Sequence, residues 1–134
     1  MSRKINVLLV DDSRTVLAQQ ERILSEIPSV AIVGMARDGA AAIRKTQESK
    51  PDLVQLDIVI PGLDGLSALR TIKSLRPETH VAMVTSVGGD AAKAEEAFRL
   101  GARQVLAKPF DFDVIDTLIE RVRADLESVG GKSG

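Results

Sequence analysis

The strongest constraint on the fold is a regular alternation between two apolar patterns along the chain. Short, almost continuously apolar runs are typical of strands buried on both faces of a sheet. Between these runs, apolar residues recur every three or four positions, which is the spacing of amphipathic helices. The runs predict strands at residues 5–10, 30–36, 53–57, 81–85 and 105–107. Because parallel strands need crossover helices, we expect an α/β fold, a three-layer αβα sandwich with a five-stranded parallel sheet.

Capping and stop signals mark where the expected helices begin and end. Ser13 is the expected N-cap of the first helix, and Asp38 is the expected N-cap of the second. Gly101 is a natural stop for the fourth helix. The sequence predicts one domain over residues 1–128, followed by a flexible tail or linker stub at 129–134 that is rich in glycine.

Composition excludes several classes of function. The 134 residues carry a net charge of −1, so no overall field attracts nucleic acid or a membrane surface. The absence of cysteine excludes thiolate chemistry, and with His80 as the single histidine nothing in the sequence resembles a zinc site. The apolar run at residues 5–10 is too short for an export signal, and no run approaches the roughly 20 residues of a membrane span. We therefore expect a cytoplasmic protein.

Polar residues gather where the expected strands end. Asp11 and Asp12 follow the first strand, Asp57 ends the third, Thr85 ends the fourth, and Lys108 follows the fifth. Ligand sites in open α/β sheets form at the carboxyl ends of the strands, so these side chains should converge. Three adjacent carboxylates repel one another unless a cation lies between them, and magnesium prefers such oxygen ligands. A phosphoryl group would fit beside that ion, and an aspartate can accept one covalently.

A nucleotide-binding loop is the main rival site in this fold class. Such a loop needs glycines after the first strand, so that backbone N–H groups can hold phosphates. This chain instead has Asp11, Asp12, Ser13 and Arg14 at that point. Two negative charges without a glycine make a phosphate-binding loop a poor interpretation.

Four segments together resemble the response-regulator receiver family of two-component signalling. They are LLVDDS, DLVQLDIVIPGLDG, VTS and GARQVLAKPF, in the order and approximate spacing of that family. The resemblance extends from Ile5 to about Leu126. It implies the flavodoxin-like strand order 2-1-3-4-5.

The resemblance also implies roles for the residues at the strand ends. Asp57 corresponds to the phosphoacceptor, with Thr85 bonding a phosphoryl oxygen and Lys108 pairing with Asp57 and later with its phosphate. Asp12 corresponds to a direct Mg²⁺ ligand, and Asp11 to one that acts mostly through water. The family pattern adds Asp57 itself and the backbone carbonyl of Val59 to the metal ligands, with Mn²⁺ as a substitute ion. The Lys108–Pro109 bond is cis in similar proteins.

Partners follow from the same resemblance. The phosphoryl donor would be a sensor histidine kinase or a histidine phosphotransfer protein. Phosphorylation would shift an existing two-state equilibrium, and a downstream protein would read the face formed by the fourth helix, fifth strand and fifth helix. The chain would be a phosphoacceptor that assists its own phosphorylation and dephosphorylation, not an enzyme.

This sequence departs from the family pattern at several positions. Val105 replaces the usual Tyr or Phe, so we expect coupling to run through Thr85 and the 86–90 loop. Val59 and Val87 occupy the positions that tune hydrolysis in relatives, and neither can orient an attacking water. A long-lived phosphoryl group is therefore expected. Gln55 lies within an apolar strand, and the sequence names no partner for its amide.

Two alternatives remain for the function. A pseudo-receiver would use the same fold for constitutive protein contacts without phosphorylation. An aspartate-nucleophile phosphatase would use similar residues, but it usually has a second acid two residues beyond the nucleophile, where this chain has Val59. The sequence is compatible with a stand-alone receiver or with a piece of a longer regulator.

Overall fold

Five parallel strands form a single sheet in the order β2-β1-β3-β4-β5, which confirms the expected strand order. The computed structural model describes residues 3–62, 64–85, 91–108 and 111–133, with side chains described as far as residue 128. The strands are β1 (Ile5–Val10), β2 (Val30–Ala36), β3 (Leu53–Asp57), β4 (His80–Thr85) and β5 (Gln104–Ala107). The last two begin one residue earlier than expected.

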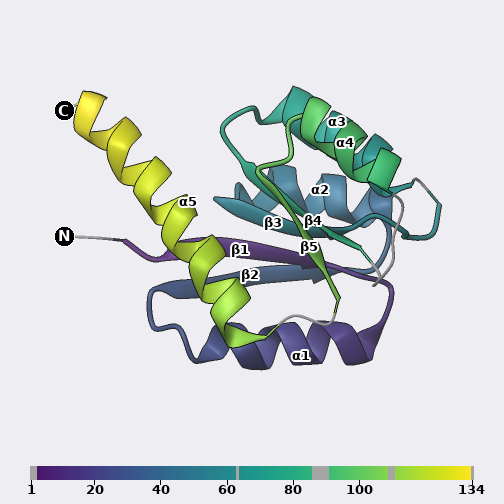
Figure 1. The fold of residues 1–134 in the computed structure, drawn as a ribbon, viewed down its shortest axis with the longest axis horizontal. Helices are drawn as coiled ribbons and strands as arrows, with labels where there is room; N and C mark the ends of the chain where they lie inside the picture. The colour runs from purple at the N-terminus through teal and green to yellow at the C-terminus, as the bar shows by residue number, and fades with distance from the viewer. Residues whose placement is uncertain (1–2, 63, 86–90, 109–110, 134) are drawn as a thin grey trace.

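Helices cover both faces of the sheet (Figure 1). They are α1 (Arg14–Ser25), α2 (Gly39–Ser49), α3 (Gly65–Leu75), α4 (Ala91–Arg99) and α5 (Phe112–Ser133). The helices α1 and α5 lie on one face, and α2, α3 and α4 lie on the other. This arrangement is the predicted three-layer αβα sandwich.

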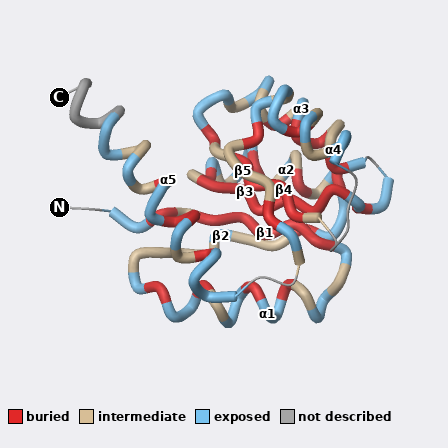
Figure 2. Tube along the Cα trace, viewed as in Figure 1, coloured by how far each residue is buried: buried red, intermediate tan, exposed pale blue. Residues whose placement is uncertain are grey.

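The alternation of side chains along each strand divides the core between the two faces. One cluster packs β-strand residues against α2, α3 and α4 through side chains that include Ala42, Leu69 and Ala97. The other packs the opposite face against α1 and α5 through Leu24, Ile119 and others. In Figure 2 the central strands are buried along most of their length. Each fully buried leucine or isoleucine contributes about 1.5–3 kcal/mol, so this double burial fixes the strand positions.

Side-chain caps begin the first two helices where the sequence predicts them. The Ser13 Oγ accepts a hydrogen bond from Val16 N at 3.2 Å. The Asp38 carboxylate accepts one from Ala41 N at 2.8 Å. Each cap satisfies a backbone N–H that has no partner within its helix. The caps therefore set the points at which the chain leaves the carboxyl edge of the sheet.

The helix α5 differs from the expectation at its C-terminal end. It continues through residues 129–133, where the sequence predicts a flexible tail. Extending an existing helix fixes one residue for each new hydrogen bond, which is far easier than starting a helix, so even a Gly-Gly pair can be included. The helix thus runs past residue 128, while the domain boundary there and the flexibility of the tail stay predictions.

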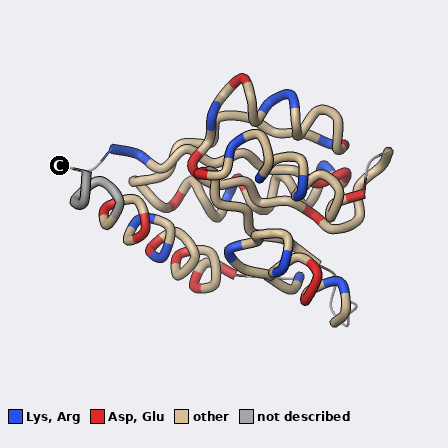
Figure 3. Tube along the Cα trace, turned by 90° about the horizontal axis from the view of Figure 1, so that it is seen from above, with Lys and Arg blue, Asp and Glu red and all other residues tan. Residues whose placement is uncertain are grey.

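Charged residues of both signs are intermixed along the helices (Figure 3). This distribution agrees with the net charge of −1. Within the described part of the chain, no helix is both long enough and apolar enough to cross a lipid bilayer.

Candidate phosphoacceptor and metal site

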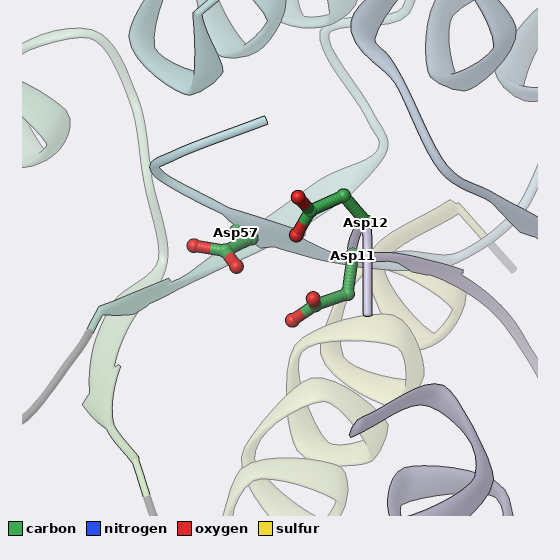
Figure 4. A group of neighbouring side chains, drawn as sticks. All are labelled: Asp11, Asp12 and Asp57. Carbon is green, nitrogen blue, oxygen red and sulfur yellow. The ribbon is translucent and has the colours of Figure 1, made fainter. Parts of the chain in front are cut away.

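Three aspartates meet at the carboxyl edge of the sheet, at the ends of the neighbouring strands β1 and β3 (Figure 4). One carboxylate oxygen from each of Asp11, Asp12 and Asp57 lies within 4.8 Å of the other two. Asp11 and Asp57 are buried, with 1% and 6% of their surface exposed. Asp12 is exposed. The structure thus brings together the three acids that the sequence singles out.

Lys108 joins two of these acids from the end of β5. Its Nζ lies 2.8 Å from Asp57 Oδ2 and 2.8 Å from Asp11 Oδ2. The contact with Asp57 is a hydrogen bond. The contact with Asp11 is an ion pair only, since Asp11 Oδ2 receives no well-directed hydrogen bond from a described residue. The sequence predicts the pairing with Asp57, but not the second contact.

The pKa values of Asp57 and Lys108 reflect this crowding. Burial raises the pKa of the Asp57 carboxyl above its ordinary value, and the nearby Asp11 carboxylate adds to the effect. Hydrogen bonds from Lys108 and from Val59 N–H oppose that rise without cancelling it. Burial alone would lower the pKa of Lys108, but its contacts with Asp11 and Asp57 raise it. The lysine is therefore a cation at neutral pH and is held by both acids.

The backbone around Asp57 is held by its neighbours. The Val59 N–H donates to Asp57 Oδ1 at 3.1 Å, and Gly65 N donates to Ile58 O at 2.8 Å. A Cβ on Gly65 would lie only 2.4 Å from Asp57 O, so the start of α3 presses against the phosphoacceptor strand. Only glycine permits this approach. The sequence shows a turn signal here, but the close contact appears only in three dimensions.

Thr85 ends β4 beside this group, as expected. Its carbonyl accepts a hydrogen bond from Lys108 N at 2.7 Å, which joins the ends of β4 and β5. Val59 is 69% exposed at the mouth of the site, and the position of its carbonyl relative to a metal stays a prediction. The predictions for Pro109, Val87 and the 86–90 loop lie outside the described residues.

The residues present fit a divalent cation. Asp11, Asp12 and Asp57 offer three hard oxygen ligands, and the single Lys108 ammonium balances only one of their charges. The two remaining negative charges match one Mg²⁺, which commonly uses a few carboxylates together with water. When bound, such an ion would neutralise charge on a transferring phosphoryl group.

One contact at this edge has no signal in the sequence. Arg37, directly after β2, donates from Nη2 and Nε to the carbonyl of Asp12, at 3.0 Å and 3.3 Å. It ties the loop that carries two of the acids to the neighbouring strand.

The comparison with known families decides the identity of this arrangement. The family model of the response regulator receiver domain matches residues 7–120. This chain belongs to the response-regulator receiver family. The receiver domains of that family act as phosphorylation-controlled switches in two-component signalling, and they bind Mg²⁺ in an acidic pocket.

Solved receiver structures share this fold. The response regulator domain of Thermotoga maritima CheB is 36% identical with a TM-score of 0.80, and the alignment covers 91% of this receiver and 96% of that domain. CheY in the CheX–CheY–BeF₃–Mg²⁺ complex of Borrelia burgdorferi is 28% identical with a TM-score of 0.82, and the alignment covers 90% of each chain.

The curated relatives are longer proteins. A protein-glutamate methylesterase/protein-glutamine glutaminase of Myxococcus xanthus is 40% identical over 78% of this receiver and 30% of the relative. The corresponding protein of Thermotoga maritima is 38% identical over 90% of this receiver and 37% of the relative. The receiver spans about a third of the length of these relatives.

Proposed function

We propose that phosphorylation of Asp57 switches this receiver, with Asp11, Asp12, Asp57 and the Val59 carbonyl holding Mg²⁺. The observation that carries the proposal is the placement of the Lys108 ammonium 2.8 Å from both Asp57 and Asp11, beside the third carboxylate. A structural ion pair would need one acid, whereas Lys108 here contacts two, and the carboxylate of Asp12 lies beside them. Mn²⁺ would bind the same ligands.

The proposed chemistry is an in-line transfer. An Asp57 carboxylate oxygen attacks the phosphorus of a phosphohistidine, the new P–O bond forms, and the P–N bond to the imidazole breaks. The imidazole nitrogen takes up a proton as it leaves. Lys108 balances charge on the transferred group, and Thr85 offers its hydroxyl to one phosphoryl oxygen. A bound Mg²⁺ would supply positive charge beside the transferred group.

The proposed donors are a sensor histidine kinase or a histidine phosphotransfer protein. The proposed output is a contact of α4, β5 and α5 with a downstream protein, with coupling through Thr85 and the 86–90 loop because Val105 replaces the usual aromatic ring. We propose that the chain supplies the switch and no methylesterase activity of its own. A cytoplasmic location stays a prediction.

The deciding experiment is the intact mass of the protein after incubation with acetyl phosphate and Mg²⁺. We expect one added phosphoryl group, which is lost with a chelator and absent in Asp57→Asn. Asp64→Asn is the matched control, because Asp64 caps α3, asparagine caps a helix equally well, and the reaction should stay intact. Equal phosphorylation of wild type and Asp57→Asn would place the acceptor elsewhere.

A pseudo-receiver would take no phosphoryl group from acetyl phosphate or from a phosphorylated histidine phosphotransfer protein. The family match and the gathered acids speak against that alternative.

The lifetime of the phosphoryl group provides a second test. Val59 is exposed at the mouth of the site and has no polar atom with which to orient water. We expect slow decay after the donor is removed, and faster decay in Val59→Asn, measured by mass spectrometry over time. Wild-type decay within a few seconds would contradict this expectation.

A further inference from the structure

We propose that Arg37 is a positioning residue for the metal site, acting through the backbone carbonyl of Asp12. The inference rests on the proposed Mg²⁺ role of Asp12. Two nitrogens of one guanidinium reach the same carbonyl oxygen, Nη2 at 3.0 Å and Nε at 3.3 Å. The planar guanidinium therefore fixes the direction of that carbonyl as well as its distance.

The Asp12 carbonyl lies just beyond the last regular contact between β1 and β2. Asp11 N donates to Ala36 O at 3.1 Å, and this bond is the final backbone link of the pair. After it, Asp38 turns away to cap α2. The consecutive residues Ala36 and Arg37 thus hold the consecutive residues Asp11 and Asp12, first by backbone and then by side chain.

Asp12 has few other restraints. Asp11 is held by its backbone, by Ser13 N at 2.9 Å and by the ion pair with Lys108. Asp12 is exposed and makes no other hydrogen bond or ion pair with a described residue. Fixing its carbonyl fixes the backbone from which the carboxylate projects, and leaves only two side-chain torsions to be ordered when a cation binds. Groups that orient metal ligands in this way typically change metal affinity by roughly 10–100-fold.

Electrostatics alone predicts the opposite effect. Arg37 forms no ion pair with a described carboxylate, so its positive charge stands near a site that should attract a cation. Removing a positive charge one Debye length away, about 10 Å at 0.1 M salt, would tighten cation binding by no more than about a few-fold in water. A positioning role therefore predicts weaker Mg²⁺ binding in Arg37→Ala, whereas a purely electrostatic role predicts tighter binding.

Arg14 provides the matched control. It is the first residue of α1, follows the same loop and is exposed. Its side chain makes no hydrogen bond or ion pair with any residue that the structure describes. Arg14→Ala thus removes a positive charge near the acids without removing the contact to the Asp12 carbonyl.

The experiment measures Mg²⁺ affinity by calorimetry, together with hydrogen exchange in the metal-free protein at the hydrogen-bonded amides of Asp11 and Ser13. We expect Arg37→Ala to raise the Mg²⁺ dissociation constant about tenfold and to speed exchange at these two amides. Arg37→Lys keeps the charge and at most one donor, so it should fall between Arg37→Ala and wild type. Arg14→Ala should leave exchange unchanged and leave affinity unchanged or slightly tighter.

Tighter or unchanged Mg²⁺ binding in Arg37→Ala would overturn the positioning role, and so would equal effects of Arg37→Ala and Arg14→Ala. Phosphorylation of the wild type by acetyl phosphate separates this outcome from a failure of the proposed function. A wild type that becomes phosphorylated, with an Arg37→Ala variant that binds Mg²⁺ normally, refutes only the role of Arg37. A wild type that takes no phosphoryl group, while Arg37→Ala still weakens Mg²⁺ binding, refutes the proposed acceptor and supports the positioning.

Discussion

Asp52 uses its carboxylate for stability, at the edge of the sheet opposite to the acidic site. Its two oxygens accept hydrogen bonds from Arg3 at 2.7 Å and 2.8 Å, and Asn6 N donates to it at 2.8 Å. Burial alone would raise the pKa of Asp52, but these hydrogen bonds hold it below its ordinary value. The ionised form is therefore favoured by folding.

This shift predicts a pH dependence of stability. A lowered folded-state pKa contributes stability above the unfolded value of about 4, and that contribution is lost as the pH falls through the folded value. We expect Asp52→Asn to be less stable than wild type at pH 7, with the difference shrinking below about pH 4. Urea unfolding at several pH values measures it. A stability difference between wild type and Asp52→Asn that stays constant down to pH 3 would contradict a lowered pKa of Asp52.

Gln55 is the clearest conflict between a single residue and its surroundings. It is fully buried on β3, and neither polar atom of its amide has a partner among the described residues. The buried amide oxygen of Gln20, on α1, also has no hydrogen-bond partner among the described residues. An unpaired buried polar group costs about 1–3 kcal/mol.

Replacing this amide with an apolar side chain of similar size should therefore stabilise the protein. We expect Gln55→Leu to raise the free energy of unfolding by about 1–3 kcal/mol in urea titrations. Gln104→Leu is a contrasting variant, because Gln104 accepts a hydrogen bond from Arg121 at 3.0 Å and should show no such gain. A loss of stability in Gln55→Leu would instead indicate an internal water bound to the amide.

Among the elements, the strands and helix caps are predictable from sequence because each leaves a local signature. Apolar runs locate the strands, and Ser13 and Asp38 mark the helix starts that the structure confirms. The acids at the strand ends are predictable because parallel topology gathers those ends. The contact from Arg37 to Asp12 is not, because a side chain that bonds a distant carbonyl leaves no periodic pattern. The length of α5 also escapes prediction, since its last residues have weak helix propensity.

The close contact between α3 and β3 leads to a prediction for Gly65. In Gly65→Ala the new methyl group would meet Asp57 O and Ile58 O at 2.4 Å and 2.5 Å. We expect a loss of about 1–3 kcal/mol in stability and slower phosphorylation by acetyl phosphate, because α3 must move away from the strand that carries Asp57.

Gly62→Ala is the control for that variant. Its Cβ would meet no atom within 4 Å, although the residue has a φ of 79°. It should cost about 1–2 kcal/mol through backbone strain and change phosphorylation less. Equal phosphorylation rates in the two variants would show that the contact between α3 and β3 does not shape the site.

At the scale of the whole molecule, α5 joins the sheet through only part of its length. Among the side chains described as far as residue 128, the buried ones of α5, which include Ile115, Ile119 and Val122, lie before residue 123. The rest of the helix extends past the sheet (Figure 1). We expect a chain that ends after Glu127 to keep its unfolding midpoint within about 8 °C, since a change in stability below 1 kcal/mol shifts it by no more than that. A larger drop in a thermal melt would show that residues 128–134 stabilise the domain.

The start of β1 and the end of α5 lie at the edge of the sheet opposite to the carboxyl ends of the strands (Figure 1). A six-residue strand such as β1 separates the two edges by about 20 Å. A protein joined to either end would therefore leave the entrance to Asp57 open to a visiting kinase. At its point of attachment it would also be too far away to contact the phosphoryl group directly. The conformational effect of phosphorylation therefore has to be transmitted across the domain through the packing of its helices.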